Sequence, residues 1–218
     1  EFADLPAVGI HPGLLVQNPE TADAIADPQG SRMGYYAAVT GLDRALGRIL
    51  DELERSGLAD QTLVAFVGDN GFNLGHHGIW GKGNGTYPFN MFDTSVKVPA
   101  IFSHPARIRT GDVRSELVSG YDLTPTILDY LGVNWEPDIA LPGGSFTHLL
   151  EGIAGSNNDS RHEDARKVVV YDEYGPVRMI RTEAYKYVHR FPDGPHELFD
   201  LLADPNERVN LIADPALE

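Results

Sequence analysis

Apolar residues recur at three- and four-residue steps between residues 33 and 56, which is the stripe of an amphipathic helix. Gly57 follows at once, in a position where glycine commonly ends a helix. Residues 1–30 show little periodicity and carry prolines at positions 6, 12, 19 and 28, which favours loops. The pattern therefore predicts a loop-rich lead-in followed by one long helix over residues 33–56.

A short continuous apolar run, residues 62–67, comes next and ends at Gly68-Asp69-Asn70-Gly71. An apolar run without alternation predicts a strand covered on both faces, as is typical of a parallel sheet. Residues 98–102 predict a second buried strand, and residues 122–131 predict a second helix. This order favours an α/β unit, in which ligands bind beyond the carboxyl ends of the strands.

The last quarter of the chain consists of short β-prone runs separated by turn residues. They predict a small antiparallel sheet, with strands at residues 168–171, 177–181, 185–189 and 197–199. Residues 207–212 predict a short closing helix. The polar stretch 157–164 separates this region from the rest, so we expect a larger α/β domain over residues 1–155 and a small subdomain over residues 156–218.

Composition narrows the classes of partner. The 218 residues include 42% hydrophobic and 22% charged side chains, which is ordinary for a globular protein. A net charge of −15 argues against nucleic-acid binding, because phosphate backbones are held by clustered Lys and Arg. No apolar run approaches the roughly 20 residues of a membrane span, so we expect no membrane insertion. The terminal dipeptides Glu1-Phe2 and Leu217-Glu218 resemble cloning remnants, and we expect the sequence to be part of a longer protein.

Asp69 and Asn70 offer adjacent carboxylate and amide oxygens, the ligands that Ca²⁺ and Mg²⁺ prefer. The alternative is a turn, since Asp-Asn-Gly is a strong turn signal by itself. Lys82 follows in the same glycine-rich stretch, and its ammonium suits a tetrahedral anion or a leaving oxygen. The alternative for Lys82 is an ordinary solvated lysine. A phosphate-binding loop is excluded, because His76 stands where that motif needs glycine and Gly83 where it needs Ser or Thr.

Seven stretches in this order resemble the sulfatases of the alkaline-phosphatase superfamily. The resemblance runs from about Gly34 to the C-terminus and rests on FVGDNG, LGHHGIWGKG, FDTSVKVPAIF, SGYDLTPTILDYLGV, LPGGSF, VRMIRTEAYKYVHR and HELFDLLADPNERVNL. It implies part of an alkaline-phosphatase-like α/β/α sandwich, followed by a small C-terminal antiparallel sheet subdomain with a helix.

The same resemblance implies roles for four residues. Asp69 and Asn70 would be metal ligands, to Ca²⁺ or alternatively Mg²⁺. Lys82 would contact the sulfate or the bridging oxygen, and His77 would take the place of the family's loop histidine in a supporting catalytic role. The substrate would be a small-molecule or saccharide sulfate ester.

This sequence departs from the family pattern at two positions. His76 replaces the more usual Glu or Asp, and Lys97 stands where many members have arginine. Phosphonate-ester hydrolases of the superfamily usually have His where Asn70 stands, so Asn70 favours sulfate esters with Ca²⁺. The alternatives are a phosphodiesterase or phosphonate monoester hydrolase of the same superfamily, and a non-catalytic binding domain.

Sulfatases use a formylglycine made from Cys or Ser in a Cys/Ser-x-Pro/Ala-x-Arg motif. The 218 residues contain no cysteine, and neither Ser31-Arg32 nor Ser160-Arg161 has the required spacing. We therefore expect the formylglycine to lie outside this sequence, and the chain alone to be inactive toward sulfate esters. The sheet of the parent fold would then be incomplete, which predicts homo-oligomers through an open strand edge.

Overall fold

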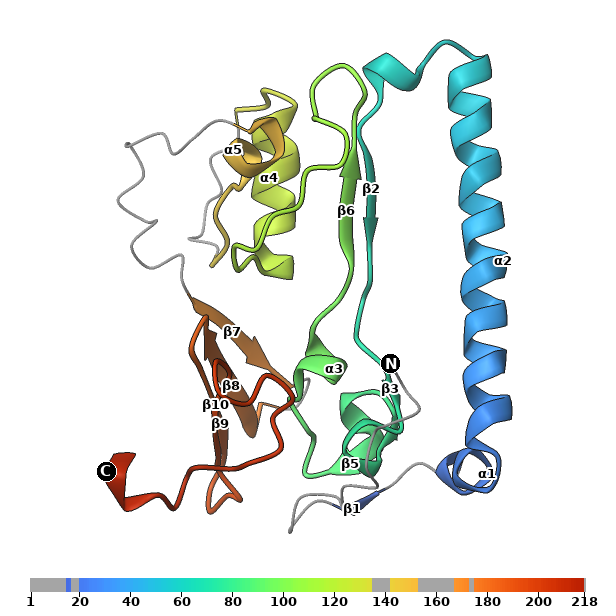
Figure 1. Cartoon of the computed structure of the whole chain (residues 1–218). Helices are drawn as coiled ribbons and strands as arrows, with labels where there is room; N and C mark the ends of the chain where they lie inside the picture. Colours follow the sequence, from blue (N-terminus) through green and yellow to red (C-terminus); the bar gives the residue numbers. More distant parts are fainter. Residues whose placement is uncertain (1–14, 17–19, 135–141, 153–166, 173–174, 218) are drawn as a thin grey trace.

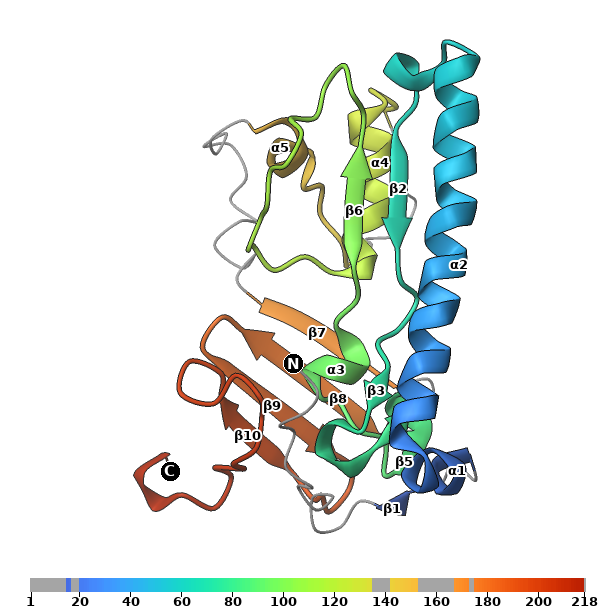
Figure 2. The same ribbon diagram turned by 45° about the vertical axis from the view of Figure 1, so that its right-hand side comes forward.

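Two antiparallel strands, β2 (Val64–Val67) and β6 (Ala100–Ser103), stand between helices in the computed structural model of the chain (Figure 1). The structure describes residues 15–16, 20–134, 142–152, 167–172 and 175–217. Both views place α2 (Pro28–Arg55) on one side of the strand pair, with α4 (Leu123–Tyr130) and α5 (Thr147–Glu151) on the other (Figures 1 and 2). This is a three-layer α/β/α arrangement around a narrow sheet.

The long predicted helix is confirmed as α2, but helical structure begins earlier than the sequence predicted. The prediction of a loop over residues 20–30 is wrong. A first helix, α1 (Glu20–Ala26), precedes α2, and Pro28 lies in the first turn of α2. Proline is well tolerated there, since its missing N–H would have no partner in that turn. The Asp27 side chain caps the helix by accepting from Gly30 N at 2.9 Å. Among the described residues, no helix is both long and apolar enough to cross a bilayer.

The predicted burial and pairing of the two central strands are wrong. β2 pairs antiparallel with β6, with Val64 opposite Ser103 and Val67 opposite Ala100. Exposed and half-buried residues alternate along β2, and β6 is mostly exposed. The helix α2 beside this pair has no buried residue, so it gives the strands little cover. Among the described residues no other strand joins this sheet, which leaves its edges open. Self-association through the open edge stays a prediction.

The predicted C-terminal antiparallel sheet is confirmed. Its strands lie in the order β10-β9-β8-β7, and every neighbouring pair is antiparallel. The bounds are β7 (Lys167–Tyr171), β8 (Val177–Thr182), β9 (Tyr185–Arg190) and β10 (Glu197–Asp200). One face buries Val177, Met179 and Val188 against Met91, which lies two residues before α3. The sheet is therefore packed directly onto the segment that leads into α3 (Asp93–Val96).

Short elements occupy the glycine-rich segment between β2 and α3. They are β3 (Asn73–Leu74), η2 (His76–Gly78), β4 (Trp80–Gly81), η3 (Gly83–Gly85) and β5 (Thr86–Tyr87), which pairs with β1 (Leu15–Val16). The remaining 3-10 turns are η1 (Ala59–Gln61), η4 (Gly120–Asp122) and η5 (Pro215–Leu217). Ile79 and Phe92 share a buried cluster with Phe199 and Leu201, so the C-terminal region fixes this segment as well.

The predicted helix over residues 207–212 is wrong. Glu207 has a positive φ of 53°, and the following chain runs beside β10 instead of coiling. Leu198 N donates to Asn210 Oδ1 at 2.9 Å, and Leu211 N donates to Leu198 O at 2.8 Å. These bonds to the sheet take the place of helical ones. The domain boundary at residue 155 and the polar stretch 157–164 lie outside the described residues.

Candidate metal and anion site

Asp69 and Asn70 lie in the loop that directly follows β2, at the carboxyl end of the strand. Backbone hydrogen bonds fix this loop on both sides, because Gly68 N donates to Pro99 O at 3.1 Å and Gly71 N donates to Ser95 O at 2.9 Å. Asp69 is exposed and Asn70 is half-buried. The loop thus presents a carboxylate and an amide from a backbone that is fastened to α3 and the residues after it.

Gly71 is where this loop comes closest to α3. A Cβ atom there would lie 2.3 Å from the carbonyl oxygen of Thr94 and 2.9 Å from that of Ser95. Backbone atoms cannot swing aside as the end of a flexible side chain can, so this approach requires glycine. The position of Asn70 relative to α3 is therefore set by main-chain contact.

The donor set of the loop fits a hard cation in part. Asn70 Nδ2 donates to Gly71 O at 2.9 Å, which leaves Oδ1 as the acceptor that a cation could use. Together with the Asp69 carboxylate this makes two side chains with oxygen ligands, whereas Ca²⁺ takes about six to eight ligand atoms. Within the described part of the chain, no group of three or more His, Asp or Glu could hold a metal ion. Asp69 and Asn70 can therefore supply only a portion of a metal site.

Three buried polar residues hold the segment around Lys82. Asn73 Nδ2 donates to Gly81 O at 3.1 Å and to Ser95 Oγ at 2.6 Å, and Ser95 Oγ donates to Asn90 Oδ1 at 2.6 Å. Asn90 Nδ2 in turn donates to Gly83 O at 3.0 Å. The residues on either side of Lys82 are thus fixed by Asn73 and Asn90. Ser95 joins this network to the loop that carries Asp69 and Asn70, since its carbonyl accepts from Gly71.

Lys82 itself is exposed at the start of η3. Its backbone carbonyl accepts from Gly85 N at 3.0 Å, which leaves the side chain extending from a fixed turn. A solvated ammonium on a fixed backbone can reach an anion without first breaking an internal ion pair.

His77 lies against Phe92, which directly precedes α3 and in turn packs against Phe199 of β10. Its ring stacks on Phe92 with centroids 3.7 Å apart and planes 5° from parallel, and its φ of 54° is left-handed. Burial, reinforced by the positive charge of Lys186 and by His76, lowers the pKa of His77 from 6.5 to about 4. The imidazole is therefore neutral at pH 7. Its supporting role in catalysis stays a prediction, while its observed contact with Phe92 is one of packing.

A buried ion cluster that the sequence reasoning missed lies at the first turn of α3. Lys186 Nζ lies 2.5 Å from Asp93 Oδ1 and 2.5 Å from Glu207 Oε1, and Arg181 donates to the other side of Asp93 at 3.2 Å. Burial raises the pKa of Glu207. Burial also acts to raise the pKa of Asp93, but Lys186 and Arg181 together outweigh it and lower that pKa.

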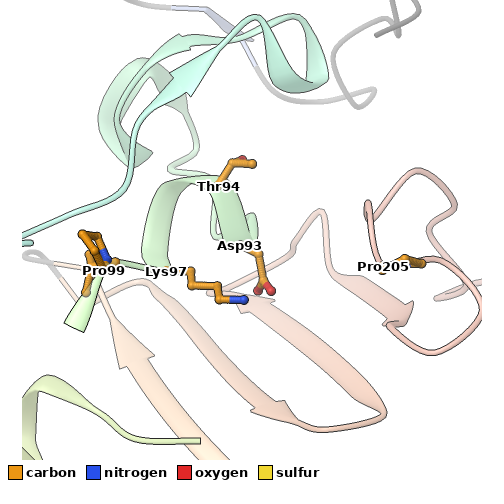
Figure 3. Close-up of a pocket in the computed structure, with 6 residues that line it drawn as sticks. Asp93, Thr94, Lys97, Pro99 and Pro205 are labelled. Atoms are coloured by element: carbon orange, nitrogen blue, oxygen red, sulfur yellow. The ribbon is translucent and has the colours of Figure 1, made fainter. Parts of the chain in front are cut away.

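An open pocket of about 450 Å³ adjoins this cluster (Figure 3). The side chains of Asp93 and Lys97 both extend toward it, and Pro205 lies on its far side (Figure 3). Its lining consists of Asp93, Thr94, Lys97, Val98, Pro99 and Pro205. The four residues predicted for the site do not line it, so this pocket and the candidate site are separate features.

Two family models match the chain. The model for sulfatases matches residues 8–133, and the model for the C-terminal region of N-sulphoglucosamine sulphohydrolase matches residues 75–218. The chain belongs to the sulfatase family. This result confirms the family that the order of the sequence motifs indicated.

Individual sulfatase relatives match over most of this chain. N-acetylglucosamine-6-O-sulfatase of Bacteroides thetaiotaomicron is 32% identical over 186 residues, which cover 81% of this chain and 31% of that protein. Choline-sulfatase of Rhizobium meliloti is also 32% identical over 186 residues, covering 85% and 34%. The crystal structure of a phosphonate monoester hydrolase of Agrobacterium radiobacter matches with a TM-score of 0.70 and 30% identity, covering 87% and 38%. The chain spans about a third of the length of the curated relatives it matches.

Similarity to solved sulfatase structures confirms the predicted fold class. The layered helices and strands belong to the alkaline-phosphatase-like α/β/α fold, and the four-stranded antiparallel sheet follows them. The predicted roles of Asp69, Asn70, His77 and Lys82 stay predictions.

Proposed function

We propose that this chain supplies part of the active site of a sulfate-ester hydrolase. Asp69 and Asn70 contribute metal ligands, and Lys82 contributes a contact to the sulfate. One observation carries the proposal: Ser95 joins both segments. Its carbonyl accepts from Gly71 N, and its hydroxyl bonds Asn73 and Asn90, whose amides donate to the carbonyls on either side of Lys82. Two oxygen-bearing side chains and one ammonium are thereby presented from a single buried support.

The ligand chemistry favours Ca²⁺, with Mg²⁺ as the alternative. Asp69 brings a negative charge and Asn70 a neutral oxygen whose amide nitrogen is already bound to Gly71 O. Mg²⁺ demands nearly ideal octahedral geometry, whereas Ca²⁺ accepts irregular sets of oxygens. When bound, such a cation would supply a Lewis acid and would lower the pKa of an attacking hydroxyl.

The exposed ammonium of Lys82 would bind the transferred sulfate or the bridging oxygen. Negative charge grows on the leaving oxygen as the S–O bond breaks, and a cation fixed beforehand stabilises that charge without rearranging. His77, being neutral and stacked on Phe92, would keep η2 in place beside this lysine.

The reaction needs a nucleophile that these 218 residues do not encode in the form of a Cys/Ser-x-Pro/Ala-x-Arg motif. A hydroxyl of the hydrated formylglycine, supplied by another segment, would attack sulfur and the alcohol would leave. The covalent sulfate would then be eliminated, which restores the aldehyde. We therefore expect the purified 218-residue chain to leave p-nitrophenyl sulfate unhydrolysed. Hydrolysis above the buffer rate that is lost in Lys82→Ala would contradict this part of the proposal.

Calcium titration followed by ¹H–¹⁵N NMR tests the metal ligands. We expect the amide signals of residues 68–71 to shift with millimolar Ca²⁺, because a site with few protein ligands binds weakly. Asp69→Ala and Asn70→Ala should each reduce the shifts, since each removes a ligand. Asp51→Ala is the matched control, because Asp51 is an exposed carboxylate on α2, remote from the loop. Equal shifts in all four proteins would sink the assignment.

The substrate is a small-molecule or saccharide sulfate ester in this proposal. An N-acetylglucosamine sulfatase and a choline-sulfatase match the chain equally well, which supports the sulfate group as the common feature. The similarity to a phosphonate monoester hydrolase favours a second candidate, hydrolysis of a phosphonate monoester. Assays of the intact parent with p-nitrophenyl sulfate and p-nitrophenyl phenylphosphonate separate the two.

A further inference from the structure

We infer that Lys186 and Glu207 are positioning residues for Asp69 and Asn70. The buried ion cluster at α3 would hold the candidate metal loop in place from the C-terminal region. This inference rests on the proposed function, because it assigns the cluster a role in metal binding. Neither residue touches the proposed ligands, so any effect passes through α3.

The first step is the attachment of α3 to the C-terminal region. Lys186 is fully buried on β9, and its Nζ contacts Asp93 and Glu207 and donates to Met91 O at 3.0 Å. Glu207 Oε2 accepts from Asp93 N at 2.6 Å. Asp93 is thus held through its side chain and its backbone N–H. A helix of four residues cannot maintain its own position, since one turn is too short to be stable alone.

The second step is the attachment of the metal loop to α3. Ser95 O accepts from Gly71 N, and Pro99 O accepts from Gly68 N, so each flank of Asp69-Asn70 has one main-chain bond to this segment. At Gly71 the loop is so close to the backbone of Thr94 that not even a Cβ atom fits between them. The path from Glu207 to Asn70 therefore runs through Asp93, Ser95 and Gly71.

The composition of the cluster supports a geometric role. Two carboxylates, Asp93 and Glu207, face two cations, Lys186 and Arg181, so the charges of the cluster balance. Lys186 and Glu207 are buried, and the other two are half-buried. Buried ion clusters are often no more stable than apolar residues of the same volume, but they accept only a few arrangements. In metal sites, residues that hydrogen-bond to the ligands commonly change metal affinity by about 10- to 100-fold when they are replaced, and we take the lower end for supports that act through α3.

The experiment uses the 218-residue chain and two readouts. Lys186→Met should speed exchange of the Gly68 and Gly71 amides in metal-free protein, and should weaken Ca²⁺ binding by about tenfold or more. If Lys186→Met does not fold, Glu207→Ala tests the inference in its place. This variant removes the acceptor of Asp93 N but leaves the ion pair between Lys186 and Asp93 intact. Glu207→Gln retains an acceptor of the same shape and should restore slow exchange and affinity.

Tyr130→Ala is the control for general loss of stability. Tyr130 is 2% exposed in α4, on the other side of the β2–β6 pair from α2, and bonds His104 rather than α3. The inference is overturned if the cluster variants exchange Gly68 and Gly71 no faster than Tyr130→Ala does, or if they bind Ca²⁺ as tightly as the unaltered chain. An unaltered chain that shows no calcium shift would sink the proposed function. The exchange rates would then still decide whether the cluster holds the loop.

Discussion

Replacement of Arg190 by methionine is expected to lower the free energy of unfolding by about 3–5 kcal/mol, because it removes one partner of a buried ion pair. Arg190 is 1% exposed, and its guanidinium lies 2.7 Å from Glu197 Oε2. It also donates to Phe89 O at 3.3 Å and to Pro195 O at 2.6 Å. Methionine has a similar volume, so the loss comes from polar contacts and from the charge left on Glu197.

Chemical denaturation followed by circular dichroism measures this effect. Arg55→Met is the matched control, because Arg55 also pairs with a glutamate, Glu52, at 2.6 Å, but the two side chains are 75% and 58% exposed. Solvated pairs contribute little, so this variant should unfold at the same denaturant concentration as the unaltered chain. Equal denaturation midpoints for Arg190→Met and Arg55→Met would contradict this prediction, because the buried ion pair would then contribute no more to stability than the exposed one.

Elements with a strong local pattern could be predicted from sequence. The apolar stripe predicted residues 33–56 as helix, and α2 covers Pro28–Arg55. The four β-prone runs correspond to β7 through β10. Such patterns are set by neighbours a few residues apart, so they remain visible whatever the rest of the chain does.

The surroundings of the central strands could not be predicted in the same way. The apolar run over residues 62–67 indicated a strand covered on both faces, and β2 is instead half-exposed beside one partner. A strand is apolar because other elements of the fold cover its faces, wherever those elements lie in the sequence. Among the described residues, β6 is the one strand that pairs with β2, and both strands keep exposed positions.

In the candidate site, too, some residues could be predicted from the sequence and others could not. Asp69, Asn70 and Lys82 could be singled out because carboxylate, amide and ammonium groups near glycines have a recognisable chemistry. The residues that support this site could not be predicted, because Lys186 lies 93 residues from Asp93 in the sequence, and Glu207 lies 114 residues from it. A sequence window cannot pair groups so far apart. The helix predicted over residues 207–212 is wrong for the same reason. The Glu207 side chain bonds Asp93 and Lys186, which are distant in the sequence, and the chain around it is not helical.

Acidification from pH 7 to about pH 4 is expected to destabilise the protein through His77 by about 3 kcal/mol. Burial lowers the pKa of His77 from 6.5 to about 4, with His76, Lys186 and Arg208 acting in the same direction and Asp204 opposing them. The unfolded chain therefore takes up this proton first. Stability from His77 is fully present above pH 6.5 and is lost as the pH falls toward the folded pKa.

His77→Asn separates this titration from other acid effects, because asparagine tolerates the left-handed φ of 54° and does not ionise. The variant should be less stable at pH 7, since it loses the ring contact with Phe92, but its stability should fall less between pH 6.5 and 4. The pKa of His76 is also lowered by burial and by Arg32, so the unaltered chain and the variant share that contribution, and their difference isolates His77. Urea unfolding at half-unit pH steps measures both slopes. Parallel curves would mean that His77 is protonated as readily in the folded chain as in the unfolded one, which contradicts a buried ring stacked on Phe92.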